Sequence, residues 1–432
     1  MFKKIQDAFR SLWQVKQVRQ KIIFTLGILA ILRFFSHIPL PGVDIITLKK
    51  VFAGNQFLGL LNIFSGGTLS NFSVIALGLA PYINASIVFQ LFSFVFPYFE
   101  QLSKEGEAGR EKIERYTKLA TIPLSVFQAL GIYALLKNQN IVGVLSPLDM
   151  INFVVTLMAG TFLLVWFGSL ISEYGIGNGI SLLIFAGIIS QMPQGIAQAF
   201  SVSHSATAIF NLLLFSALSL LVIMGVIAVT EANRRVPVQY AKRVRGRKMY
   251  GGGSTYLPFK LNQAGVIPII FAVSLVLLPS MIGRFLGQSG SGTVAHLASS
   301  LADLFTPGTF IYALAYFSLV VVFTFFYTMI IFDPKKIAEE IKKFGGFVPG
   351  IRPGKPTAAF LSYVSLRITL PGAIFLGAIA VLPTVIQGFT GVKSLAIGGT
   401  GVLIVVSVIL ETVKSVENMI QMRGYDKFLD KF

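Results

Sequence analysis

The chain has 432 residues, of which 54% are apolar and 12% are charged, and its mean hydropathy is +0.75. Soluble proteins carry roughly 25% charged residues, so this composition excludes a water-soluble enzyme and predicts that lipid surrounds most of the chain. The chain contains no cysteine, which excludes disulfides, thiol catalysis and zinc–thiolate sites, and His37, His204 and His296 are too far apart in sequence for a metal-ligand motif.

Ten apolar segments have about the length that crosses a bilayer core of ~30 Å. They occupy residues 22–38, 74–96, 119–136, 151–171, 181–200, 208–230, 263–280, 310–332, 363–383 and 398–418. The sequence therefore predicts an all-α polytopic membrane protein with ten transmembrane helices.

The lysines and arginines are distributed unevenly over the two sides that these spans define. One side, which includes both termini, holds 29 of the 36, the other side holds five, and Arg33 and Arg367 lie inside or at the edge of spans. Because cytoplasmic loops carry the excess of basic residues, we expect both termini to be cytoplasmic. The net charge of +18 then marks the cytoplasmic face and predicts no specific nucleic-acid partner.

Two apolar stretches do not fit the spanning pattern. Phe2, Ile5, Phe9 and Leu12 recur at helical spacing among basic residues, which predicts an amphipathic helix on the membrane surface. A cleaved signal peptide is the alternative, but no small-residue cleavage site follows at the usual distance. Residues 59–72, LGLLNIFSGGTLSN, are apolar but too short to cross, which predicts a re-entrant or plug segment, with an interfacial helix as the alternative.

A short motif occurs in both halves of the chain. Span two contains GLAPYI from Gly78 and span seven contains GVIPII from Gly265, both of the form G-x-x-P-x-I and five spans apart. This spacing indicates two five-helix halves, residues 1–200 and 201–432. Because five is odd, the halves are inverted relative to each other, an arrangement that places a central site at their interface. Glycine and proline are frequent in membrane helices, so a chance match is the alternative.

Two loops on the basic side, residues 231–262 and 333–362, are longer and richer in glycine and proline than topology requires. They favour binding of a large anionic partner. The alternative is that their charges only set the topology and attract anionic lipid.

The spans contain no chemistry for catalysis or ion coupling. None of the 18 acidic residues lies in the middle of a span, no G-x-x-x-x-G-K-[ST] loop occurs, and residues 175–179, GIGNG, join two predicted helices as a tight hairpin. We therefore expect neither an enzyme nor a protein with a bound metal or cofactor. An aliphatic constriction excludes water and ions by dewetting and offers no specific ligand, which favours translocation of a polymer. A solute transporter and a membrane-embedded enzyme are the alternatives.

Seven stretches of the chain resemble the bacterial SecY family of protein-conducting channel subunits, in the same order. They are PYINASIVFQL (81–91), EGEAGREKIERYT (105–117), GIGNGISLLIFAGI (175–188), RRVPVQYAKRVRGRKMYGGGSTYLPFKLN (234–262), AGVIPIIFA (264–272), FGGFVPGIRPGKPTA (344–358) and GGTGVLIVVSVI (398–409).

The resemblance implies a channel subunit that passes unfolded secretory polypeptides across the cytoplasmic membrane and releases apolar helices sideways into lipid. The implied pore has an hourglass shape and lies between the inverted halves, with a seam between spans two and three on one side and seven and eight on the other. The implied partners are SecE, SecG, the SecA motor, the ribosome, signal sequences and membrane lipid. Asn84 departs from the Ser or Thr common in the family at this seam.

The resemblance also implies three groups of functional residues. The pore ring consists of Ile83, Ile87, Ile184, Ile188, Ile270 and Ile404. The plug consists of Leu60, Leu61, Asn62, Ile63, Phe64, Ser65, Gly66, Gly67, Thr68, Leu69, Ser70 and Asn71. The motor- and ribosome-binding residues are Arg243, Arg245, Arg247, Lys248, Arg352 and Lys355. The spacing of Ile83 with Ile87, and of Ile184 with Ile188, independently places each pair on one helix face.

Overall fold

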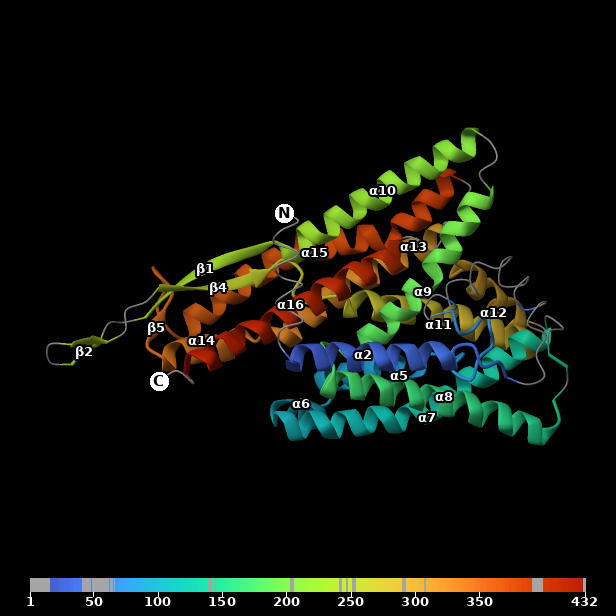
Figure 1. Ribbon diagram of the computed structural model, residues 1–432, viewed down its shortest axis with the longest axis horizontal. Helices are drawn as coiled ribbons and strands as arrows, with labels where there is room; N and C mark the ends of the chain where they lie inside the picture. The colour runs from blue at the N-terminus through green and yellow to red at the C-terminus, as the bar shows by residue number, and fades with distance from the viewer. Residues whose placement is uncertain are drawn as a thin grey trace.

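A computed structural model shows a bundle of long helices from which a narrow β-structure projects at one end (Figure 1). The structure describes residues 16–40, 48, 62, 65, 67–138, 142–143, 145–202, 206–240, 243–245, 248–250, 254–289, 293–306, 308–390 and 399–429. The predicted surface helix at residues 2–12 lies outside these residues, as do Leu60, Leu61, Ile63, Phe64 and Gly66 of the predicted plug.

The first part of the chain contributes only helices to the described structure. They are α2 (Lys16–Phe35), α5 (Ala80–Val95), α6 (Pro97–Lys104), α7 (Glu107–Asn138), α8 (Pro147–Tyr174), α9 (Gly179–Val202) and α10 (Ala206–Glu231). The predicted hairpin at residues 175–179 is confirmed, because α8 ends at Tyr174 and α9 begins at Gly179.

The second part mixes helices with short strands. The strands are β1 (Asn233–Tyr240), β2 (Arg243–Arg245), β3 (Lys248–Tyr250), β4 (Ser254–Lys260) and β5 (Gly346–Phe347). The helices are α11 (Ile267–Ser289), α12 (Thr293–Leu304), α13 (Phe310–Ile331), α14 (Pro334–Lys343), α15 (Lys355–Thr390) and α16 (Gly399–Leu429). Each of the ten predicted spans overlaps one helix; in chain order these are α2, α5, α7, α8, α9, α10, α11, α13, α15 and α16.

The helices differ in whether they can cross a membrane by length and composition alone. Within the described part of the chain three qualify, at Pro147–Tyr174, Phe310–Lys343 and Lys355–Leu382. A fourth arises if α5 and α6, which are bent by 100° at Phe96, count as one span. Span two is shorter than predicted because residues 74–79 are turns, so that α5 begins only at Ala80.

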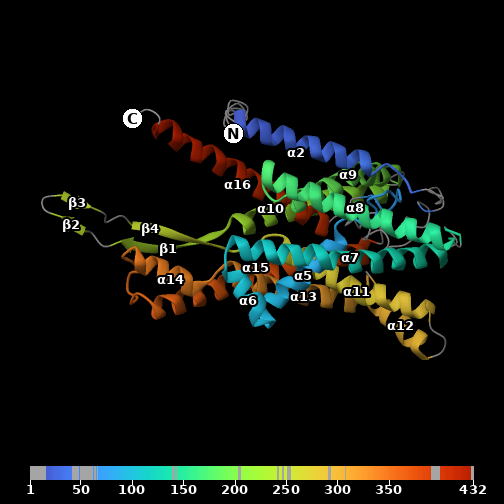
Figure 2. The ribbon, with the colours of Figure 1, turned by 90° about the horizontal axis from the view of Figure 1, so that it is seen from below.

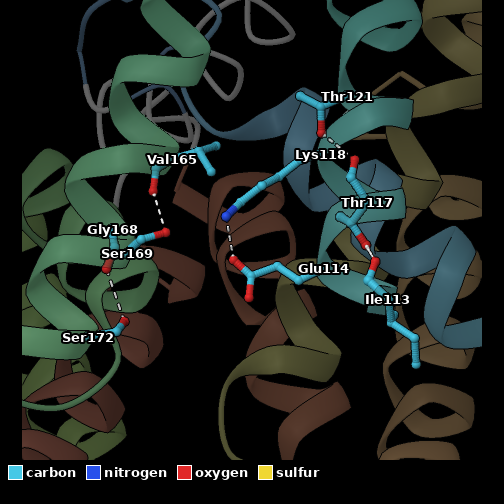
Figure 3. A network of polar contacts seen from close by, with 9 residues as sticks. All are labelled: Ile113, Glu114, Thr117, Lys118, Thr121, Val165, Gly168, Ser169 and Ser172. Atoms are coloured by element: carbon cyan, nitrogen blue, oxygen red, sulfur yellow. Dashed lines mark hydrogen bonds and ion pairs between the residues drawn. The ribbon is translucent and has the colours of Figure 1, made fainter. Parts of the chain in front are cut away.

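Hydroxyl side chains within the bundle form hydrogen bonds to their own helices. In α7, Thr117 Oγ1 donates to the Ile113 carbonyl at 2.9 Å and Thr121 Oγ1 donates to the Thr117 carbonyl at 2.8 Å. The serines of α8 do the same, and the one ion pair drawn beside them, Lys118 with Glu114 at 2.7 Å, also lies within α7 (Figure 3). Polar groups that are satisfied within one helix leave the apolar faces free to pack in lipid.

The two basic loops share a three-stranded sheet in the order β4-β1-β5, which the sequence analysis did not predict, and β2 and β3 form a separate two-stranded sheet. β1 pairs antiparallel with β4 from Asn233↔Lys260 to Gln239↔Ser254, and its last residues pair with β5 at Gln239↔Phe347. Val236, Val238 and Phe259 are buried from this sheet against α14 and α15. Burial of alternate residues on one face holds the two loops together as one unit.

The bundle has two distinct ends. The first turns of α2, the last turns of α16, the sheet and α14 all lie toward one end (Figures 1 and 2). Helix α12 and the end of α11 lie toward the opposite end (Figure 2). The described segments that the charge distribution assigns to the basic side are therefore gathered at one end of the molecule.

Candidate functional site

The two copies of the G-x-x-P-x-I motif adopt the same local structure. Gly78 has φ +61° and Gly265 has φ +67°, a left-handed conformation that favours glycine. Helix α5 begins two residues after Gly78 and α11 begins two residues after Gly265. The proline of each motif lies in the first turn, where its missing N–H is tolerated. Each copy thus starts a helix at a defined point inside the bundle.

Isoleucines from four helices meet in one buried cluster at this level. Ile184 and Ile188 of α9 are 5% and 1% exposed, and Ile270 of α11 and Ile404 of α16 are 6% and 0% exposed. Ile83 of α5 is half-buried and packs against the same cluster. The structure therefore brings together five of the six isoleucines that the resemblance implied.

Ile87 lies elsewhere. It is buried at 4% exposure, but it belongs to the neighbouring apolar cluster, to which α11 and α13 contribute the most residues. Ile87 lies one turn beyond Ile83 on the same helix, and the i, i+4 spacing alone does not decide which neighbours it meets.

The cluster also contains residues that the sequence analysis did not name. Leu79 and Val266 directly follow the two glycines of the repeated motif, and both are 4% exposed in this cluster. Val405 and Val408 of α16 join them. The repeat offered a signal for Leu79 and Val266, because equivalent positions of inverted halves face the same interface.

The described residues of the predicted plug form a compact turn beside this cluster. Thr68 Oγ1 donates to the carbonyls of Ser65 at 2.6 Å and Ile75 at 3.0 Å, and Leu69 is 3% exposed. A cavity of about 280 Å³ lies next to the turn, and Ser65, Thr68 and Ile184 contribute to its lining. The turn therefore lies close to the isoleucine cluster with open space on one side.

Two contacts join α5 to α13, where the predicted seam lies. The Tyr327 hydroxyl of α13 donates to Gln90 Oε1 of α5 at 2.6 Å. The rings of Phe94 and Phe326 have centroids 4.5 Å apart. Asn84, on the same helix as Gln90, is half-buried. One hydrogen bond and one aromatic pair thus connect elements from the two predicted halves.

We call the end of the bundle that carries the strands and α14 the sheet end. The predicted partner-binding residues occupy two places on it. Arg243 and Arg245 belong to β2, Lys248 belongs to β3, and Arg247 lies outside the described residues. The β2–β3 hairpin projects beyond the rest of the protein (Figures 1 and 2).

Arg352 is exposed in the turn that follows β5, and Lys355, also exposed, is the first residue of α15. Gly350 at φ +80° and Gly354 at φ +103° bound this turn, and Thr357 Oγ1 donates to the Arg352 carbonyl at 2.9 Å. The Arg352 guanidinium is therefore presented on an ordered backbone.

Comparisons with a family model, with curated proteins and with solved structures all match this chain to related proteins. The SecY family model matches residues 73–413. The protein translocase subunit SecY of Mycobacterium bovis is 45% identical, covering 98% of this chain and 99% of that protein. A solved structure reported with the statement that the plug domain of SecY stabilises the closed state of the translocation channel and maintains a membrane seal has a TM-score of 0.65 at 20% identity, covering 93% and 92% of the two chains. Sec61 in a canine ribosome–channel complex from the endoplasmic reticulum has a TM-score of 0.62 at 18% identity, with the same two coverages.

Proposed function

This chain belongs to the SecY family of protein translocase subunits, and from that premise we propose that its isoleucine cluster is the seal of a protein-conducting channel. The chain is a channel subunit of the translocase in the cell membrane, where it passes unfolded secretory polypeptides across and releases apolar helices into lipid. It is not an enzyme, and the family gives no support to the alternative of a solute transporter.

The observation that carries this proposal is the meeting of Ile83, Ile184, Ile188, Ile270 and Ile404, which come from four helices far apart in sequence. A constriction lined by aliphatic side chains excludes water, so ions do not cross it at rest. The same side chains offer no specific ligand, so polypeptides of any sequence can pass once the helices move apart. Ile87, which packs in the neighbouring cluster, is proposed to line the channel only when α5 moves.

Serine substitution tests the seal. We expect replacement of Ile184, Ile188, Ile270 and Ile404 together to let the purified complex pass ions at rest in a planar bilayer, because a hydroxyl-lined constriction holds water. The control replaces Leu157 and Leu361 with serine; both are 0% exposed, and neither belongs to the isoleucine cluster. It should lower the melting temperature without passing current. Each large-to-small change costs roughly 1–5 kcal/mol of stability. Destabilised but electrically silent isoleucine variants would remove the seal from this position.

The plug candidate and the seam complete the proposed channel. The turn formed by the described part of residues 60–71 lies beside the isoleucine cluster, which supports a role in closing the channel at rest. The related protein whose plug is reported to maintain a membrane seal supports the same role. The hydrogen bond and the aromatic pair between α5 and α13 are proposed to hold the seam closed until a signal sequence or an apolar helix parts it.

The sheet end is proposed as the cytoplasmic docking surface. It carries Arg243, Arg245 and Lys248 on the projecting hairpin and Arg352 and Lys355 on the second loop, and we assign the neighbouring Arg247 to the same surface. Basic side chains suit the acidic surface of a motor such as SecA or the RNA of a ribosome. The similar Sec61 channel in a ribosome complex supports the second partner. SecE and SecG are proposed as membrane partners of the bundle, and both termini are proposed to be cytoplasmic.

A further inference from the structure

Gln191, on α9, forms hydrogen bonds to the plug candidate. Gln191 follows Ile184 and Ile188 at the i, i+4, i+7 spacing that defines one face of a helix. Its side chain therefore continues the isoleucine face by one turn, toward the end of α9 that the charge distribution places outside.

Gln191 makes two hydrogen bonds in opposite directions to the same residue of the plug candidate. Its Nε2 donates to the Asn62 carbonyl at 3.0 Å, and its Oε1 accepts from Asn62 Nδ2 at 3.2 Å. Both side chains are half-buried. One hydrogen bond donated and one accepted use both ends of the amide, so a side chain that lacks either a donor or an acceptor cannot make the pair.

Asn62 in turn holds the plug turn together. Its Oδ1 accepts from the Ser70 N–H at 2.8 Å, and its carbonyl also accepts from the Gly67 N–H at 2.8 Å. The residue that contacts α9 is therefore also the residue that orders the turn. A force that separates Asn62 from Gln191 acts on the whole turn rather than on one side chain.

Gly67 makes room for the glutamine. Its φ is +80°, and a Cβ at this position would lie 2.9 Å from Gln191 Nε2 and 3.1 Å from Gln191 Cγ. The turn and the amide are thus in direct contact along the backbone. On the other side of the turn a Cβ at Gly78 would lie 3.1 Å from the Ser65 Cα, so the backbone before α5 closes over the turn as well.

The cavity of about 280 Å³ beside Ser65 and Thr68 leaves this turn incompletely packed. On the side that faces α9, the hydrogen bonds of Asn62 with Gln191 hold the described part of the turn. We infer that Gln191 is a latch that keeps the plug candidate in its closed position through the paired hydrogen bonds with Asn62. This inference rests on the proposed function, since a latch has meaning only if the segment closes a channel.

The test uses the full chain purified with its native partner subunits and a Gln191→Met substitution, which preserves side-chain length and removes both hydrogen bonds. We expect the resting current in planar bilayers to rise about tenfold, equal to a shift of about 1.4 kcal/mol in the closed–open equilibrium. A maleimide should also modify a cysteine placed at Asn71 about tenfold faster, and because the chain contains no cysteine, this label is specific. Gln101→Met is the matched control, because Gln101 is exposed on α6.

A deletion of residues 60–71 separates the two ways in which the experiment can fail. If the deletion conducts at rest while Gln191→Met matches Gln101→Met in current and labelling, the latch is overturned and the proposed function stands. If the deletion and the isoleucine variants are all silent, the proposed function itself fails. Should the Gln191→Met chain not insert, Gln191→Asn replaces it, because an amide that is one methylene shorter cannot make both bonds.

Discussion

Individual residues determine where the helices of this bundle begin and how its turns are fixed. Gly78 and Gly265 adopt left-handed conformations that cost other residues roughly 1–2 kcal/mol. The same conformation recurs at Gly350 and Gly354, which hold the turn that carries Arg352. Positions of this kind place functional side chains where regular helix geometry would not.

Arg352 provides a prediction at the residue scale. We expect Arg352→Glu to impair motor-driven transport, because a guanidinium on an ordered turn can pair bidentately with a partner carboxylate. Loss of a charge contact buried at an interface costs about 2–5 kcal/mol, whereas loss of a solvated surface charge costs little. The measurement is ATP-dependent uptake of a secretory protein into proteoliposomes.

Lys137→Glu is the control for this prediction, because Lys137 is exposed at the last turn of α7, away from the sheet end. Equal uptake by the two variants, at equal melting temperature, would assign Arg352 to topology alone.

At the scale of elements, the contact between α5 and α13 tests whether specific side chains hold the seam closed. The two helices contact each other through the hydrogen bond of Tyr327 with Gln90 and the aromatic pair of Phe94 with Phe326. A net hydrogen bond contributes about 0.5–1.5 kcal/mol. A contact of this size is strong enough to favour a closed seam and weak enough to be opened by a bound apolar helix.

Tyr327→Phe removes this hydrogen bond and keeps the ring that packs 5.5 Å from Phe271. We expect the seam to open more often. Spin labels on cysteines replacing Val88 of α5 and Val322 of α13, both exposed, should show more long distances.

Tyr316→Phe on the same helix is the control, because the buried Tyr316 hydroxyl has no hydrogen-bond partner within the described residues. Its loss should leave the distances unchanged. An identical distance distribution for Tyr327→Phe and Tyr316→Phe would exclude the hydrogen bond as a closing contact.

On the scale of the whole molecule, the elements of the basic side lie at the same end of the bundle. The sheet, α14, the start of α2 and the end of α16 lie toward one end, and the basic loops belong to that end (Figures 1 and 2). A bilayer around the bundle would leave this end in water. From the positive-inside rule we propose that the sheet faces the cytoplasm.

Cysteine labelling tests this orientation. Labels at Lys112, Arg247 and Lys355 should react only from the cytoplasmic side of intact cells or inverted vesicles. Labels at Lys49 and Lys393 should react only from the outside. Arg247, Lys49 and Lys393 lie outside the residues that the structure describes, so their assignment rests on the sequence. Reaction of any one position from both sides would contradict the ten-span topology.

The sequence alone determined the class of this protein, the location of its ten helical spans and its repeated glycine–proline motif. These features follow from composition, apolar length and local backbone rules, which a linear chain displays directly. The resemblance to the SecY family implied the five isoleucines that meet in one cluster. Helical spacing independently supported only the pairing of residues on one helix, as for Ile184 and Ile188.

Only the tertiary structure decided which faces meet. It placed Ile87 in a neighbouring cluster, joined the two basic loops through β1 and β5, and paired Gln191 with Asn62. These contacts join residues far apart in the chain, and their choice depends on how the helices pack as whole bodies rather than on any local pattern. A polar residue one turn beyond an apolar face looks ordinary in the sequence. The partner of Gln191 is evident only from the tertiary structure, in which the plug turn contacts α9.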